Sequence, residues 1–230
     1  VSVDEASRIQ LGLSEVNRVL GGGMVTGSVV LLSGEPGVGK STILLQIADD
    51  LAQRNSKVLY VSGEESISQI KLRCLRIGLE GKNVYLLSET DVDEVIRSLM
   101  DMEPAVAVID SVQTLYAQDI SSSPGSVAQV RECTRRLMRW AKGQRRSLFI
   151  TGHVTKDGSL AGPRVLEHMV DVVLYLDGED ISSYRVLRSA KNRFGSTNEV
   201  GLLQMVDSGI QEVEDPSQVF LAERVSGAVG

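Results

Sequence analysis

The chain has 230 residues, of which 42% are hydrophobic, 23% charged and only 4% aromatic, and its formal net charge is −6. A chain of this length and apolar content can bury one substantial core, which excludes wholesale disorder and favours one large domain over two small ones. The few aromatic residues disfavour a lectin-like or stacking-dominated surface, and the acidic balance means that any nucleic-acid binding needs locally placed basic residues.

The cysteines and the apolar runs indicate where the protein works. Cys74 and Cys133 have no C-x-x-C partner, so we predict neither a zinc site nor a disulfide but two reduced thiols in a cytoplasmic protein. No apolar run approaches the ~18 residues of a membrane span, and Val1 begins no basic-then-apolar signal sequence. We expect residues 1–230 to be one domain excised from a longer protein, with no membrane partner.

Strand and helix patterns alternate from residue 28 to residue 149. Apolar runs typical of strands buried on both faces occupy residues 28–33, 57–62, 83–87, 105–110 and 147–151. Apolar residues at helical spacing occupy residues 40–54, 66–77, 91–100 and 126–142. This order predicts repeated βαβ units, and therefore an α/β fold with a mainly parallel sheet flanked by helices.

The pattern changes after Asp171. Four close-spaced strands joined by turn residues are predicted at residues 171–176, 184–189, 199–206 and 210–213. Short connections of this kind join antiparallel strands. We therefore expect the sheet to end in a C-terminal antiparallel extension.

A phosphate-binding motif lies between the first apolar run and the helix predicted over residues 40–54. It matches G-x-x-x-x-G-K-[ST] with Gly34, Glu35, Pro36, Gly37, Val38, Gly39, Lys40 and Ser41. Such a loop wraps backbone N–H groups around phosphate oxygens; Lys40 bridges the β- and γ-phosphates, and Ser41 offers its hydroxyl to Mg²⁺. Thr42 is placed on the α-phosphate side. ATP and Mg²⁺ are the predicted ligands; the alternative is a tight glycine turn that only enters a helix.

Carboxylates follow two other predicted strands. Asp110 ends the run at residues 105–110 and is the predicted carboxylate near Mg²⁺, with Ser111 polarising the neighbouring water; alternatively, Asp110 caps the next helix. Glu64 and Glu65 follow the run at residues 57–62, at the same sheet edge, where one of them can orient or deprotonate the attacking water. We choose Glu64 and keep Glu65 in reserve; alternatively, both only favour the N-terminus of the next helix.

Two further stretches resemble a known family. Residues 191–195 read KNRFG, and residues 12–23 read GLSEVNRVLGGG ahead of the phosphate motif. Together they resemble the bacterial RadA (Sms) family, whose layout is similar to RecA and the DnaB-type helicases, and the resemblance covers nearly the whole chain. Complete members resemble a three-part layout, with an N-terminal four-cysteine zinc module and a Lon-protease-like domain that have no counterpart in residues 1–230.

The resemblance implies a function. It implies a RecA-like, DNA-dependent ATPase of recombinational repair that forms a ring, a hexamer, and is similar to a helicase that drives branch migration on single-stranded DNA beside a recombinase. The rival interpretation is a nucleotide-switched assembly module, similar to KaiC-like proteins, which binds protein partners. A small-molecule kinase is disfavoured because no lid-like insertion is visible between the predicted core strands.

Three more side chains are candidates for catalysis. Lys191 and Arg193 are two residues apart, so on a strand both leave from the same face and can reach a neighbouring subunit's γ-phosphate, as arginine fingers do. Alternatively, they form a solvated basic turn. His153 occupies a position that resembles the polar γ-phosphate sensor of RecA-like motors, although a lone histidine at a strand end is alternatively structural.

Two Gly- and Ser-rich loops match the DNA loops of RecA-like rings in order, at residues 113–128 and 155–164. Lys156 and Arg164 are the predicted contacts to DNA phosphates; alternatively, both segments are surface loops. A basic run between residues 135 and 146 is interpreted as a solvated or subunit-facing surface rather than a DNA site.

Overall fold

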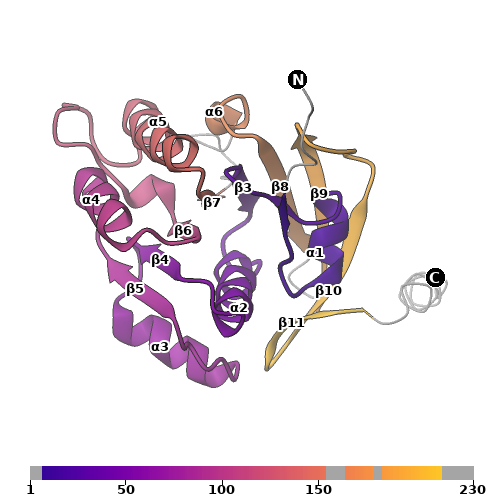
Figure 1. Ribbon diagram of the computed structural model, residues 1–230. Helices are drawn as coiled ribbons and strands as arrows, with labels where there is room; N and C mark the ends of the chain where they lie inside the picture. The colour runs from indigo at the N-terminus through magenta and orange to yellow at the C-terminus, as the bar shows by residue number, and fades with distance from the viewer. Residues whose placement is uncertain (1–6, 154–163, 179–182, 214–230) are drawn as a thin grey trace, which may run out of the picture.

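The computed structural model describes residues 7–153, 164–178 and 183–213, and a nine-stranded sheet forms its centre (Figure 1). Its strands are β3 (Val29–Gly34), β4 (Val58–Ser62), β5 (Val84–Ser88), β6 (Val106–Asp110), β7 (Ser147–His153), β8 (Val172–Gly178), β9 (Tyr184–Asn192), β10 (Val200–Val206) and β11 (Gly209–Glu212). Their order across the sheet is β11-β10-β9-β8-β3-β7-β6-β4-β5. All nine predicted strands are therefore confirmed.

Helices cover both faces of this sheet. The long helices are α2 (Lys40–Gln53), α3 (Ile67–Arg76), α4 (Val92–Met102) and α5 (Val127–Gln144). Short elements are α1 (Ser14–Val19), α6 (Arg164–Glu167), the 3₁₀ turn η1 (Val112–Thr114) and the pair β1 (Arg8–Ile9) and β2 (Met24–Val25). The four predicted helices are confirmed to within two residues at each end, because capping side chains such as Ser66 and Ser126 fix where α3 and α5 begin.

Alternation of side chains along the central strands divides the core into two layers. In β3, Val30 and Leu32 pack with α1, α2 and α3, whereas Val29 and Leu31 pack with α4, α5 and α6. Apolar residues at every position of a strand are required when both faces are covered. The crossover helices thereby fix the direction of the strands, and β3, β4, β5, β6 and β7 are all parallel.

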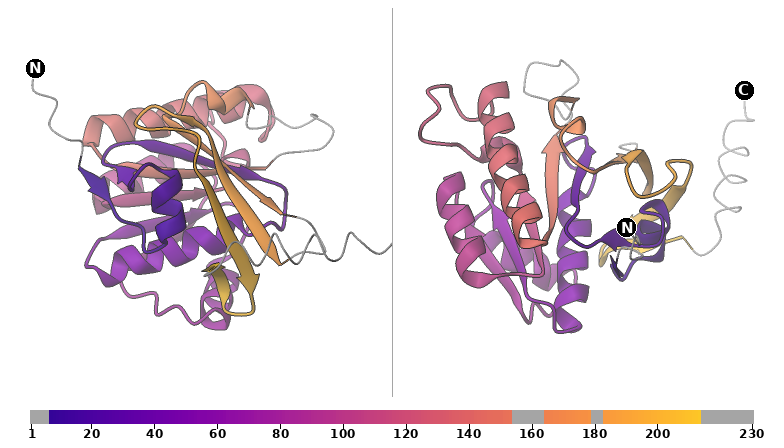
Figure 2. Two further views of the ribbon diagram at one scale, coloured as in Figure 1. Left: turned by 90° about the vertical axis from the view of Figure 1, so that its right-hand side faces the viewer. Right: turned by 45° about the horizontal axis from the view of Figure 1, so that its top comes forward.

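The change from parallel to antiparallel pairing takes place at β8, which has one neighbour of each kind. Residues 172–175 of β8 pair in parallel with β3, whereas β9, β10 and β11 are antiparallel. The strand predicted at residues 171–176 therefore begins the antiparallel extension through its pairing with β9, as predicted, but it also continues the parallel part of the sheet through its pairing with β3. The segment between β7 and β8, which contains α6, is long enough for a crossover, and a crossover lets β8 run parallel to β3. Figure 2 shows the antiparallel strands along one side of the molecule, with α1 packed against them.

Within the described residues, no helix is long and apolar enough to cross a membrane. Cys74 and Cys133 are both free thiols.

Candidate active site

The phosphate motif joins β3 directly to α2. Gly39 is the N-cap of α2 and has φ = 114°, a left-handed backbone conformation that glycine adopts without strain. A Cβ at Gly39 would also lie 2.5 Å from the side chain of Met205 on β10. Arg185 on β9 donates a hydrogen bond to the Val38 carbonyl at 3.0 Å. The antiparallel strands therefore contact the back of the loop and help to fix its shape.

Lys40 is the first residue of α2 and is only 4% exposed. Its Nζ donates to the carbonyl oxygens of Gly34 (2.9 Å) and Glu35 (2.8 Å), within the loop itself. Burial lowers the pKa of Lys40 to about 8, although the carboxylates of Asp110 and Glu64 act in the opposite direction. The amine is thus held inside the motif, where a phosphate would compensate for its loss of solvation.

This lowered pKa predicts proton uptake when nucleotide binds. Phosphate charge next to Lys40 raises the pKa of its amine again, so above about pH 8 binding must protonate the amine and ATP affinity must fall as the pH rises. Titration calorimetry at pH 8.5, in buffers of different ionisation enthalpy, should detect uptake of a fraction of a proton. Uptake should vanish at pH 6.5, where the amine is already charged, and uptake equal at both pH values would show that another group titrates.

Asp110 ends β6 next to this loop and is 5% exposed. Its Oδ2 accepts a hydrogen bond from the Tyr60 hydroxyl (2.5 Å) and its Oδ1 accepts one from the Thr151 hydroxyl (2.7 Å). Both donors lie on neighbouring strands, β4 and β7, so the carboxylate has one fixed orientation. The described residues contain no cluster of three or more His, Cys, Asp or Glu that could hold a metal.

Such a site fits Mg²⁺ and does not fit a metal that needs a protein cage. Mg²⁺ prefers oxygen ligands, keeps several waters and is bound through one or two carboxylates together with substrate phosphates. The Ser41 hydroxyl and the Asp110 carboxylate supply oxygens of this kind beside the phosphate motif. When bound, the ion would neutralise charge on the β- and γ-phosphates.

Glu64 lies at the centre of a hydrogen-bonded group at the end of β4. Its Oε1 accepts a hydrogen bond from the Ser111 hydroxyl (2.6 Å) and lies 2.9 Å from His153 Nε2. These contacts, His153 first, together with Lys40, lower the pKa of Glu64 to about 2 despite its partial burial. Ser111, predicted to polarise water, therefore orients Glu64 instead.

Glu65 has a different environment from its neighbour. Its Oε1 lies 2.5 Å from the Arg73 guanidinium on α3, so its charge is already paired. The Ser62 hydroxyl accepts hydrogen bonds from the backbone N–H groups of both Glu64 (3.3 Å) and Glu65 (3.0 Å), which fixes the turn between β4 and α3. Of the two carboxylates, Glu64 is the one with contacts to Ser111 and His153 in the cleft.

His153 connects the cleft to the segment after β6. The Gln113 side chain on η1 donates to the His153 carbonyl and accepts from the His153 N–H, both at 3.3 Å. A glutamine side chain that pairs with a backbone amide in this way was not predicted, because no sequence pattern marks it.

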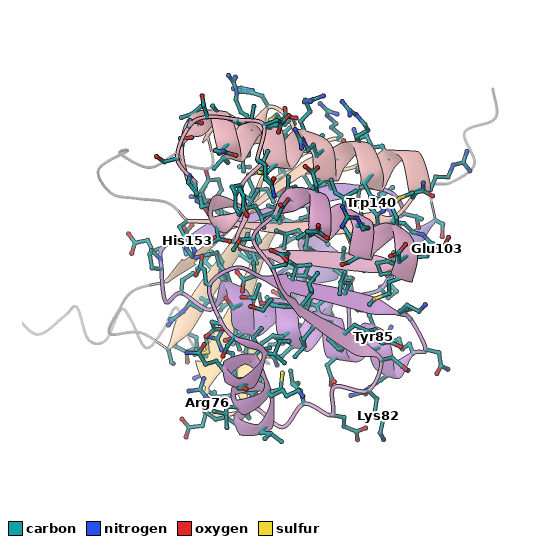
Figure 3. All side chains as sticks on the ribbon, turned by 90° about the vertical axis from the view of Figure 1, so that its left-hand side faces the viewer. Arg76, Lys82, Tyr85, Glu103, Trp140 and His153 are labelled. Atoms are coloured by element: carbon teal, nitrogen blue, oxygen red, sulfur yellow. The ribbon has the colours of Figure 1, made fainter. Side chains whose placement is uncertain are left out.

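Most of the predicted catalytic and phosphate-binding residues line one cleft of about 470 Å³ (Figure 3, on the side of His153 and Arg76). Its walls are Pro36, Gly37, Gly39, Lys40, Ser41, Thr42, Glu64, Glu65, Arg73, Arg76, Asp110, His153 and Met205. Arg73 and Arg76 were not predicted to line the site, although their spacing of three residues on a helix after the glutamate pair places both on one face. Lys156 lies outside the described residues, as does the side chain of Arg164.

Lys191 and Arg193 lie away from this cleft. They sit at the end of β9 that pairs with the start of β8, whereas the phosphate motif follows the end of β3, which is parallel to β8. Lys191 Nζ donates to the carbonyls of Glu167 (2.7 Å) and Val170 (2.8 Å), and Arg193 lies 3.1 Å from Asp171. Seven strand residues at about 3.3 Å each separate the two ends, so these cations do not meet the chain's own phosphate motif.

Comparison with known proteins agrees with this geometry. A family profile described as AAA domain matches residues 2–159. The chain is 52% identical over 230 residues to DNA repair protein RadA of Bacillus subtilis (strain 168) and 54% identical to that of Listeria monocytogenes, and it covers 50% of each. DNA repair protein RadA of Synechocystis is 51% identical, and the match covers 96% of this chain and 47% of that protein. The chain thus spans about half the length of these relatives.

The fold also matches a solved structure. A KaiC-like protein of the archaeon Pyrococcus horikoshii OT3 is similar with a TM-score of 0.74 at 21% identity, and the match covers 90% of this chain and 99% of that one. A phosphate motif, a buried carboxylate on the neighbouring strand and a mainly parallel sheet with an antiparallel extension are the parts of a RecA-like core. The chain therefore belongs to the AAA domain family and is the RecA-like P-loop ATPase domain of the RadA family.

Proposed function

We propose that this domain hydrolyses ATP to move along single-stranded DNA during recombinational DNA repair, as one subunit of a hexameric ring. The relatives that share half or more of its residues are named DNA repair proteins, which supports a role in repair. Movement along DNA, assembly into a ring and a recombinase partner go beyond what that name states and are part of our proposal. We place the protein in the cytoplasm, and take residues 1–230 to act as one ATPase domain.

The observation that carries the motor proposal is the connection from Glu64 to both predicted DNA loops. His153 contacts Glu64 at 2.9 Å and directly precedes residues 154–163, which contain Lys156. Gln113 pairs with the backbone of His153 and begins the other predicted loop, residues 113–128. A change at the γ-phosphate that moves Glu64 or His153 is thereby passed to both loops.

The chemistry proposed for the cleft is in-line attack of water on the γ-phosphate. Glu64 is ionised at neutral pH and accepts a hydrogen bond from the attacking water, which aligns it. Lys40 neutralises phosphate charge from the motif, and Ser41 and Asp110 hold the Mg²⁺. Arg193, with Lys191, belongs to a neighbouring subunit's site, because neither reaches the phosphate motif of its own chain.

We expect single-stranded DNA to stimulate ATP hydrolysis several-fold, and we expect His153→Ala to lose most of this stimulation. His153→Gln serves as the matched control, since an amide can still hydrogen-bond to Glu64 and should retain part of the response. A phosphate-release assay at saturating ATP, with and without an unstructured oligonucleotide, measures both effects.

DNA that changes neither the rate nor the assembly state would contradict the motor proposal. A domain whose turnover responds only to a protein partner would then fit the KaiC-like alternative better.

A further inference from the structure

One face of α5 carries a row of basic side chains. Exposed cationic residues recur there at intervals of three or four positions, about one per turn: Arg131, Arg135, Arg139, Lys142 and, one residue past the helix, Arg145. The other exposed residues of α5 are Val127 and Ala128 in its first turn and Gly143 and Gln144 in its last. We call these five residues the α5 basic ridge. The helix has 18 residues and is therefore about 27 Å long. Figure 3 shows side chains tipped with nitrogen pointing away from the molecule along α5.

The α5 basic ridge has more positive charge than its neighbours neutralise. Arg131, Arg139 and Arg145 have no carboxylate partner in the part of the chain that the structure describes. Arg135 pairs with Glu132 at 2.6 Å, and Lys142 lies 3.2 Å from Asp171, which it shares with Arg193.

Arg136 on the same helix differs from the ridge residues because its charge is neutralised by ion pairs within the protein. Its guanidinium contacts Asp93 (2.7 Å), Asp119 (2.6 Å) and Glu132 (2.8 Å), and its side chain is only 15% exposed. Arg136 therefore ties α5 to α4 and to the loop before α5. The ridge arginines on the exposed face make no such ties, and in a chain of net charge −6 their concentration on one line needs another explanation.

The two ends of the ridge indicate what kind of polyanion it meets. The first end follows directly on the predicted DNA loop, since Ser126 caps α5 at the last residues of that loop. The second end opens on a cleft of about 640 Å³ whose walls include Lys142, Arg145, Asp171 and Arg193. The basic residues thus lie between the predicted DNA loop at residues 113–128 and the KNRFG motif.

A protein partner fits this surface poorly. The centre of a protein interface is usually depleted of charge and enriched in aromatic and other apolar side chains, whereas the one large hydrophobic residue of α5 that is exposed is Val127, in its first turn. Evenly spaced arginines match phosphates instead, because a guanidinium donates two parallel hydrogen bonds to phosphate oxygens.

We propose that the α5 basic ridge binds the sugar-phosphate backbone of a single DNA strand beyond the predicted loop at residues 113–128, without reading its bases. The proposal rests on the DNA function proposed above and adds a second contact surface to the loops. It also changes the interpretation of the basic run, which the sequence alone favoured as a solvated or subunit-facing surface.

The test is the salt dependence of DNA binding by Arg131→Ala/Arg135→Ala/Arg139→Ala. For a single strand, each phosphate contact contributes about −0.7 to the slope of log affinity against log salt concentration, so loss of three contacts should make the slope shallower by about two. Fluorescence anisotropy with a labelled oligonucleotide of about 30 nucleotides should also show roughly tenfold or greater weakening at low salt. ATP hydrolysis without DNA should be unchanged, since the three residues do not line the nucleotide cleft.

The matched control removes three exposed cations elsewhere, with Arg54→Ala/Lys57→Ala/Lys82→Ala. This variant has the same net charge as the ridge variant but should retain the parental slope and affinity, because none of the three is on α5: Arg54 follows α2, Lys57 precedes β4 and Lys82 precedes β5. If both variants lose the same affinity, the effect is one of net charge and the ridge proposal fails. A duplex of equal length tests the strand: equal weakening on duplex and single strand would overturn the assignment to a single strand.

Two outcomes separate this proposal from the proposed function. If DNA stimulates hydrolysis in the parent and the ridge variant binds DNA with the parental slope, the ridge proposal is wrong while the motor remains. If the parent does not bind DNA at all, both proposals fail together. A ridge variant that keeps its DNA affinity but no longer self-associates in sedimentation would identify the ridge as a subunit contact, which also overturns the proposal.

Discussion

Glutamine in place of Glu64 is expected to slow ATP hydrolysis by about 10²–10⁴-fold, the range that a positioned acid or base contributes, while ATP still binds. Hydrogen bonds from His153 and Ser111 hold the Glu64 carboxylate in one orientation and lower its pKa to about 2. A carboxylate with so low a pKa orients water as a hydrogen-bond acceptor. Glutamine keeps the size but offers an amide whose N–H₂ cannot accept a hydrogen bond. Single-turnover hydrolysis, with nucleotide binding measured separately, checks the expectation.

The pH dependence of the same reaction follows from the sign of this shift. Because the pKa of folded Glu64 is about 2, below the usual glutamate value, its carboxylate is fully ionised above pH 4. It becomes protonated, and stops accepting a hydrogen bond from water, only as the pH falls towards 2. Titration of Glu64 should therefore not change the hydrolysis rate between pH 5 and pH 7. Any change of rate with pH in this range should be present in both the parent and Glu64→Gln.

Glu65→Gln is the matched control for Glu64→Gln. Glu65 is paired with Arg73, so its replacement should alter the position of α3 and leave most of the hydrolysis rate. If Glu65→Gln caused the larger loss, the two glutamates would have exchanged roles and the pairing with Arg73 would be the catalytic arrangement. Equal and small losses would mean that neither carboxylate orients water.

Local patterns predicted most of this site because each signal lies within a few neighbouring residues. The phosphate motif stands between a continuous apolar run and a helix whose apolar residues repeat at 3.6-residue spacing, and the structure has β3, the loop and α2 in those places. Asp110 and Glu64 follow apolar runs, and parallel strands bring the ends of such runs to one sheet edge. The positions of these carboxylates could therefore be predicted from local sequence patterns, whereas their hydrogen-bond partners could not.

Contacts between distant segments were not predictable in the same way. The pairing of Gln113 with His153 joins residues 40 positions apart, and the Arg185 contact to the Val38 carbonyl joins residues 147 positions apart. Such contacts depend on which strands become neighbours, and strand order is the part of a sheet that a single sequence specifies least. The same limit applies to the strand at residues 171–176, which pairs antiparallel with β9 as the meander pattern predicted, while its parallel pairing with β3 was not predicted.

Lys191 and Arg193 illustrate both a feature that sequence spacing predicts and one that it does not. Spacing alone placed Lys191 and Arg193 on one strand face, but the structure gives them different partners, namely the carbonyls at the end of α6 for Lys191 and the Asp171 carboxylate for Arg193. Burial lowers the pKa of Lys191, whose amine is held by those carbonyls. Arg193 has one partner and a side chain that is 48% exposed. Arg193 is therefore the better placed of the two to leave its partner and meet a phosphate from outside.

Alanine in place of Arg193 is expected to reduce hydrolysis in the assembled protein by about 10³-fold, at the lower end of the effect of an arginine finger. The physical reason is that Arg193 lies at the opposite end of the sheet from its own phosphate motif, so its charge reaches the reaction only across a subunit boundary. Arg188→Ala is the matched control, because Arg188 lies on β9, the strand that Arg193 directly follows, is 51% exposed and pairs with one carboxylate, Asp177. That variant should keep nearly the full rate.

Mixing two inactive variants tests the subunit boundary directly. Lys40→Ala lacks a working phosphate motif but still presents Arg193, whereas Arg193→Ala has the opposite defect. In a closed ring assembled from equal amounts, roughly one interface in four combines the intact motif of one subunit with the intact arginine of the next. Hydrolysis should therefore reappear on mixing, to about a quarter of the parental rate. Mixed rings that form but stay inactive would show that Arg193 acts within its own chain, through the Asp171 contact, and that the site is not shared.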